Sequence, residues 1–163
     1  MIIRPETIDD IEAIFHLTQA AFATMPYSDG SEGPIINHLR KDGHLLLSLV
    51  VDHEGEIVGQ ISFSPIALNG EMDGLYGLGP VSAHPDRQKQ GIGSALIQEG
   101  ISRLRDAKAI FLIGDPNYYS RFNFIGDCGL TYGEVPPEYV QGLFLDDNSR
   151  TGELQYVPAF DTN

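Results

Sequence analysis

Apolar residues recur at helical spacing close to the N-terminus. The set that fits one face of a helix is Ile8, Ile11, Ile14, Phe15 and Phe22. This pattern predicts an amphipathic helix, preceded by a short strand over Ile2–Arg4. Thr7 is suited to the N-cap of the helix, and Asp10, three residues later, gives a carboxylate variant of the capping box.

A loop and a second, shorter helix follow. Met25 to Gly33 has the composition of a loop, with Pro34 just beyond it. Apolar residues then recur at Ile35, Ile36 and Leu39. This spacing predicts a helix that ends near Gly43.

Three apolar runs in the middle of the chain have the pattern of strands. Leu45–Val51 and Ile57–Ser64 are joined by the polar residues 52–56, which predicts an antiparallel hairpin. Leu75–Ala83 is the third strand. It contains two glycines and Pro80, and Pro80 has no N–H to donate to a neighbour, so regular pairing is weakened there.

A central helix is predicted from Ile92 to about Ala107. Gly100 lies inside it at a cost of ~1 kcal/mol relative to alanine, so close packing is its expected reason. Ala109–Ile113 reads as a buried strand, and strand, helix and strand together imply a parallel element in a mixed sheet. Pro116 suits the first turn of a short helix capped by Asp115. Weaker strand signals follow at Leu130–Tyr132, Leu143–Leu145 and Glu153–Val157.

These elements predict a single α/β domain (of the α+β type) over residues 1–163, with a mixed central sheet flanked by helices. There is no apolar run of ~18 residues and no pattern of a signal peptide. The lone Cys128 fits a reducing compartment, so a cytoplasmic location is expected.

The chain is strongly acidic, with a net charge of −13. Such a field repels nucleic acid and anionic membranes, so neither is expected as a partner. It would attract a cationic substrate such as a protonated amine. A plain role in solubility is the alternative interpretation of the same charge.

Two glycines at the start of the central helix indicate a phosphate site. Gly91 and Gly93 leave backbone N–H groups accessible where the helix dipole is positive, and Arg87 and Lys89 add positive potential nearby. No Gly-Lys pair exists for a P-loop. Leu96 stands where a dinucleotide fingerprint needs its third glycine, so that loop is excluded as well.

The remaining pattern, Gln88-x-x-Gly91-x-Gly93, resembles the pyrophosphate loop of the GNAT superfamily of N-acetyltransferases. The opening segment 2–10 and the segment Tyr118–Phe124 resemble the same superfamily. Segments 78–85, 114–122 and 135–139 look like one bacterial subgroup, the YhbS-like acetyltransferases. The resemblance runs from residue 2 to about residue 160.

The resemblance implies a sheet in which the strand over 75–83 splays from its neighbour, with acetyl-CoA bound as co-substrate in the slot. The strand end would pair with the pantetheine amides, and a strand-end N–H near Val81 or Ser82 suits the developing oxyanion. The implied cofactor-binding residues are Val81, Ser82, Ala83, Gln88, Lys89, Gln90, Gly91, Ile92, Gly93 and Ser94.

Tyr119 occupies the position of the family's tyrosine acid. A phenol with an ordinary pKa of ~10 is protonated at neutral pH and can donate to the departing thiolate. Tyr118 would point about 100° away on a helix, so it is the weaker candidate. Asn123 replaces the family's glycine before Phe124, and asparagine tolerates the left-handed backbone of that turn. The family's upstream asparagine is absent at its usual spacing.

No general base stands out from the sequence. Glu32 matches a glutamate of the subgroup in the region that would cover the acceptor, and Asp29 and His84 are further candidates. An amine can also lose its proton through ordered water. The five histidines show no close ligand pair, so no metal site is expected.

The predicted function is direct transfer of an acetyl group from acetyl-CoA to an amine on a small molecule or peptide. One rival is a non-catalytic module that binds acyl-CoA as a sensor or regulatory subunit. The other keeps catalysis with another acyl donor or a hydroxyl acceptor. The acceptor, the acyl chain length, the base and the oligomeric state stay open, with a homodimer as one candidate assembly.

Overall fold

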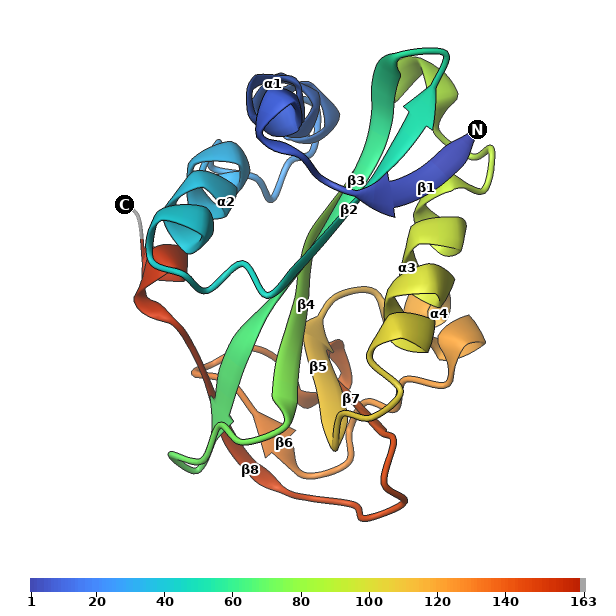
Figure 1. Cartoon of the computed structure of the whole chain (residues 1–163). Helices are drawn as coiled ribbons and strands as arrows, with labels where there is room; N and C mark the ends of the chain where they lie inside the picture. The colour runs from blue at the N-terminus through green and yellow to red at the C-terminus, as the bar shows by residue number, and fades with distance from the viewer. Residues whose placement is uncertain (162–163) are drawn as a thin grey trace.

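The computed structural model describes residues 1–161, which form a mixed sheet with helices on both faces (Figure 1). The sheet order is β1-β2-β3-β4-β5-β7, and β8 pairs with both β3 and β6. The strands are β1 (Ile2–Pro5), β2 (Leu47–His53), β3 (Glu56–Leu68), β4 (Leu75–Ala83), β5 (Ala109–Ile113), β6 (Leu130–Thr131), β7 (Val140–Phe144) and β8 (Gly152–Tyr156). The helices are α1 (Ile11–Phe22), α2 (Glu32–Lys41), α3 (Ile92–Arg103) and α4 (Pro116–Tyr119).

The two faces of the sheet are covered by different helices. Figure 1 shows α1 and α2 on one side and α3 with α4 on the other. Neighbouring strand residues alternate between these faces, so Val50 packs under α1 and α2 while Leu49 and Val51 pack under α3. Short 3₁₀ turns complete the chain at Ile8–Asp10, Pro85–Arg87, Ser120–Phe122, Pro137–Tyr139 and Pro158–Asp161.

Strand β4 leaves its parallel neighbour β5 after three residue pairs. The two strands are paired only over Leu75–Gly77 and Ala109–Phe111. On its other edge, β4 stays antiparallel to β3 as far as Ala83, with a register shift opposite Ile61 and Phe63. Beyond Gly77 the edge of β4 that faced β5 has no strand partner among the described residues. The splay expected from the resemblance is therefore present.

Helix α3 packs on the sheet at unusually close range. A β-carbon at Gly100 would lie 2.5 Å from ring carbons of the fully buried Phe63, and one at Gly59 of β3 would lie 2.5 Å from Ile92. Close packing against Phe63 therefore explains the glycine inside α3, as predicted.

Helix α3 ends at Arg103 rather than near Ala107, and β7 covers Val140–Phe144 rather than Leu143–Leu145. Three further differences have a local explanation. Helix α2 begins at Glu32 rather than after Pro34, because proline is accommodated in a first helical turn. Strand β3 runs through Pro65 to Leu68, because pairing with β2 ends at Phe63 and pairing with β8 begins at Ile66, so Pro65 lies in the gap. Ile8 was expected on the buried helix face but is 82% exposed, in the 3₁₀ turn before α1.

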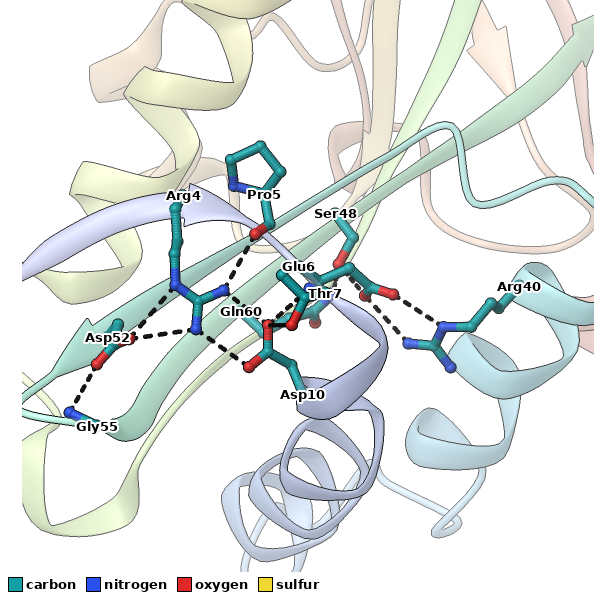
Figure 2. A network of polar contacts seen from close by, with 10 residues as sticks. All are labelled: Arg4, Pro5, Glu6, Thr7, Asp10, Arg40, Ser48, Asp52, Gly55 and Gln60. Carbon is teal, nitrogen blue, oxygen red and sulfur yellow. Dashed lines mark hydrogen bonds and ion pairs between the residues drawn. The ribbon is translucent and has the colours of Figure 1, made fainter.

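The start of α1 is joined to the sheet by a charged pair. Arg4 of β1 donates to both carboxylate oxygens of Asp10, at 2.7 and 3.1 Å, and also to Asp52 of β2 (Figure 2). Asp10 accepts from the Thr7 backbone N–H at 2.7 Å, which supplies the carboxylate half of the predicted capping box. The Arg4 guanidinium, opposed by burial, lowers the pKa of Asp10 to about 2.

A second polar chain reaches from α2 into the sheet. Arg40 donates to both oxygens of Glu6, Ser48 of β2 donates to Glu6, and buried Gln60 of β3 donates to Ser48 and Ser62 (Figure 2). Hydrogen bonds of this kind offset the cost of burying polar groups, although the Gln60 Oε1 has no partner among the described residues. The chain thus ties the end of α2 to β2 and β3 through Glu6.

Gly100→Ala is expected to destabilise the fold by ~1–3 kcal/mol through overpacking against Phe63, although alanine favours helices by ~1 kcal/mol. Urea unfolding gives the free energy. Ser102→Ala, an exposed change in the same helix, is the control and should be neutral or stabilising. Equal gains for both variants would contradict the packing argument.

Asp10→Asn is expected to lower the free energy of unfolding by roughly 1.5–3 kcal/mol at pH 7, because a charged hydrogen-bonded pair is lost. The folded pKa of about 2 lies below the ordinary value of 3.8, so the wild-type advantage is complete above pH 4. It disappears as the pH falls towards 2. Urea unfolding from pH 2.5 to 7 measures the difference. The exposed Asp9→Asn serves as control, and a wild-type advantage independent of pH would contradict the assignment.

Candidate active site

The N-terminus of α3 opens into a pocket of about 420 Å³. Gly91 has a φ of +82° and precedes the helix, so its left-handed backbone requires glycine there. Three cationic side chains line this pocket in an otherwise acidic protein. The complete lining is Ala83, Arg87, Lys89, Gly91, Ile92, Gly93, Ser94, Tyr118 and Arg121. The arrangement matches the chemistry of a phosphate site, and we refer to this cavity as the phosphate pocket for that reason.

One wall of this pocket is formed by Tyr118 and Arg121, which were not predicted to lie there. The Tyr118 and Ser94 hydroxyl oxygens lie 3.4 Å apart, and the Arg121 guanidinium carbon lies 4.7 Å from the centre of the Tyr118 ring. A β-carbon at Gly93 would lie 3.2 Å from the Tyr118 hydroxyl, so glycine lets this wall approach. The one feature of the sequence that could have indicated this wall is a basic residue, Arg121, two positions after Tyr119.

Most of the predicted cofactor residues gather around this pocket. Ala83, Lys89, Gly91, Ile92, Gly93 and Ser94 line it. Gln88 and Gln90 are exposed beside it, and the Gln88 amide donates to the Ala83 carbonyl at 3.5 Å. The Ser82 side chain is buried in the sheet, and its hydroxyl has no partner among the described residues.

The splay of β4 and β5 opens a larger cavity of about 950 Å³. Its lining comes from β4, from the end of β5, from α4 and from the segments after α1 and before β7. The lining residues are Phe22, Met25, Tyr27, Leu78, Gly79, Pro80, Val81, Ile113, Gly114, Asp115, Tyr118, Tyr119, Val135 and Tyr139. Val81 therefore lies in the slot as predicted, and Tyr118 belongs to both cavities.

Tyr119 enters this cavity from the end of α4. The side chain of Asp115 accepts from the Asn117 N–H at 2.9 Å, so it caps α4 as predicted, and Asn123 ends the following turn at a φ of +72°. Among residues 1–161 the Tyr119 hydroxyl has no hydrogen-bond partner. Burial first, and then nearby Tyr118, Tyr27 and Asp115, raise the pKa of Tyr119 well above its ordinary value. The phenol therefore stays protonated further into the alkaline range than the sequence analysis assumed.

The candidate bases lie outside the cavity lining. The Glu32 carboxylate, in the first turn of α2, accepts from the Ser28 hydroxyl at 2.6 Å, and its charge contributes to raising the pKa of Tyr27. Asp29 accepts from Ser31, and the His84 ring accepts from the Asp86 N–H. The charge of Glu32 thus acts on a residue that lines the cavity, whereas Asp29 and His84 are engaged locally.

The described residues contain no group of three or more His, Cys, Asp or Glu side chains placed to hold a metal ion. Within residues 1–161, every helix is too short or too polar to span a lipid bilayer.

Comparison with known proteins identifies a family and several relatives. A model of the acetyltransferase (GNAT) family matches residues 11–124. The chain is 34% identical over 127 residues to the N-acetyltransferase YhbS of Escherichia coli strain K12, covering 76% of this chain and 73% of that protein. It is 32% identical to the N-acetyltransferase YjhQ of the same strain, covering 91% of this chain and 94% of that protein.

Two solved structures have the same fold with a cofactor bound. A GNAT family acetyltransferase from Brucella melitensis in complex with acetyl-CoA has a TM-score of 0.88 and 40% identity, covering 98% of this chain and 97% of that one. YhbS from Escherichia coli in complex with CoA has a TM-score of 0.89 and 29% identity, covering 98% and 91%. With its splayed strands and phosphate pocket, the chain belongs to the GNAT acetyltransferase family and is similar to YhbS.

Proposed function

We propose that the chain transfers an acetyl group from acetyl-CoA directly to an amine. The observation that carries this proposal is the unpartnered Tyr119 hydroxyl in the slot between β4 and β5, next to the phosphate pocket. The acetyl-CoA and CoA found in the two solved relatives support the choice of donor. The pyrophosphate would lie at the start of α3, and the thioester would reach the slot beside Val81.

In this mechanism the neutral amine nitrogen attacks the thioester carbonyl carbon, and a carbon–nitrogen bond forms. The carbonyl electrons move to oxygen, where an N–H on the free edge of β4 near Val81 can donate. When the intermediate collapses, the carbon–sulfur bond breaks with its electron pair going to sulfur, and the nitrogen gives up one proton. No acyl-enzyme forms, because the nitrogen attacks the donor itself.

Tyr119 acts on the leaving sulfur. A thiol has an ordinary pKa of ~8.5, and the pKa of Tyr119 is raised above that of a free phenol, so complete proton transfer to the thiolate is uphill. The hydroxyl therefore stabilises the developing charge by donating a hydrogen bond while the proton arrives from the amine. Glu32 is the proposed acceptor of the proton that an ammonium substrate loses before it attacks, acting through water, because the charge of Glu32 acts on Tyr27, which lines the cavity.

The alternative functions differ in what the protein does with bound cofactor. An acyl-CoA sensor would bind acetyl-CoA without turnover, and a relative with another donor or a hydroxyl acceptor would turn over with different partners. The free hydroxyl of Tyr119 favours an enzyme. The proposed place of action is the cytoplasm, with a small-molecule or peptide amine as partner, without nucleic acid or membrane; a homodimer stays open.

Steady-state CoA release with acetyl-CoA, against a panel of amines, peptides and alcohols, tests the proposal. Turnover with amines and not with the matching alcohols is expected. Binding of acetyl-CoA without any turnover would favour the sensor, and turnover with alcohols alone would favour a hydroxyl acceptor.

Tyr119→Phe is expected to lower kcat by roughly 10²-fold, because the hydroxyl that assists the leaving thiolate is lost while the ring is kept. Affinity for acetyl-CoA should barely change. The wild type should keep its rate to about pH 10 or above, because burial raises the pKa of Tyr119. Steady-state and single-turnover rates across pH provide the measurement.

Tyr132→Phe is the matched control, since Tyr132 lies outside the large cavity. A folded Tyr119→Phe protein with wild-type single-turnover rates would reject the role of Tyr119.

Arg121→Gln is expected to weaken acetyl-CoA binding by about tenfold, because a cation of the phosphate pocket is removed. The loss should shrink as salt rises, since the contact is electrostatic. Calorimetric titration at low and physiological ionic strength measures it. Arg105→Gln makes the same charge change at an exposed position outside the pocket, and equal losses in both variants would contradict the assignment.

A further inference from the structure

The large cavity has one part that belongs to the cofactor slot and one part that does not. β4, the end of β5 and α4 supply the slot. The remaining lining comes from the end of α1, the loop before α2, and the segment between β6 and β7. These residues are Phe22, Met25, Tyr27, Val135 and Tyr139.

This second part is the wall that an acceptor would meet, because it faces the same space as Tyr119. All five of its side chains are apolar or aromatic. Tyr27 is 76% exposed, so it stands where the cavity opens to solvent. An apolar wall binds apolar surface and offers few partners for polar groups.

The cavity lining contains a single charged side chain, Asp115. One oxygen of its carboxylate accepts from the Asn117 N–H at the start of α4, so this charge is already engaged at the helix N-terminus. The reacting amine is neutral, and a further ammonium group on the acceptor would lose its water among otherwise uncharged lining side chains, which is unfavourable.

The acidic surface is not evidence that a polycation binds inside the cavity. The net charge of −13 is spread over the whole chain and raises the local concentration of every cation. Attraction of a cation to the protein surface and its fit to the cavity are therefore separate steps. The cavity lining decides which amine fits.

We propose that the acceptor is a monoamine with an apolar body, aromatic or aliphatic, rather than a polyamine, an aminoglycoside or another polycation. This inference rests on the proposed function and narrows its substrate class. The apolar body lies against the wall built by Phe22, Tyr27 and Val135, and the amine nitrogen points to the thioester near Tyr119.

Hexylamine and 1,6-diaminohexane form the test pair, because they share a six-carbon chain and differ by one ammonium group. The expected kcat/KM with acetyl-CoA is at least about tenfold higher for hexylamine. Calorimetric binding of both amines to the protein saturated with CoA should give the same order, and this readout does not depend on turnover.

Tyr27→Glu adds a carboxylate to the wall at an exposed position, so folding should be retained. It is expected to shift the ratio of the two kcat/KM values towards the diamine by about tenfold, since the second ammonium gains a partner. Met72→Glu adds the same charge to an exposed apolar position outside the cavity and should leave the ratio unchanged.

The outcomes separate the two proposals. Equal or better use of the diamine by the wild type would overturn the monoamine inference and leave acetyl transfer to amines intact. Absence of turnover, with acetyl-CoA still bound, would reject the proposed function. In that case, hexylamine binding tighter than the diamine would support the cavity assignment, and equal binding or no binding would overturn it.

Discussion

The limited pairing of β4 with β5 is the constraint on which the site depends. Two parallel strands that stayed paired to their ends would use their backbone groups on each other and leave no slot. Here the pairing stops after Gly77 and Phe111, while β3 continues to hold the opposite edge of β4. One edge of a well-anchored strand thereby becomes available to a ligand. The cavity, its tyrosine and the approach to the phosphate pocket all follow from this separation.

The two faces of the sheet are held in different ways. On the α3 face, glycines let the helix and sheet approach closely, and Phe63 is fully buried in an apolar cluster. On the opposite face, arginine–carboxylate pairs and buried Gln60 fix α1 and α2 (Figure 2). Apolar packing alone tolerates sliding more readily than directional hydrogen bonds do. The polar network therefore fixes the start of α1 and the end of α2 on the sheet.

Much of this fold could be predicted from the pattern of the residues. Leu75–Ala83 and Ala109–Ile113 have their predicted bounds because apolar runs end there at turn residues. The course of β3 past Pro65 could not be predicted, since it depends on where its two neighbours end and begin.

The candidate site also has a part that could be predicted and a part that could not. The loop at Gly91 and Gly93 and Tyr119 were singled out from local spacing and from the resemblance, and each lines a cavity. Tyr118 and Arg121 could not be placed in the phosphate pocket, because they reach it only when the chain after β5 returns to the start of α3. That Tyr118 forms part of both cavities has a thermodynamic consequence: a group that moves the Tyr118 ring when it binds in one cavity changes the room left in the other. Occupancy of the two cavities is then linked, and linkage is reciprocal. Whatever factor a ligand in one cavity applies to the affinity for a ligand in the other, the second applies equally to the affinity for the first.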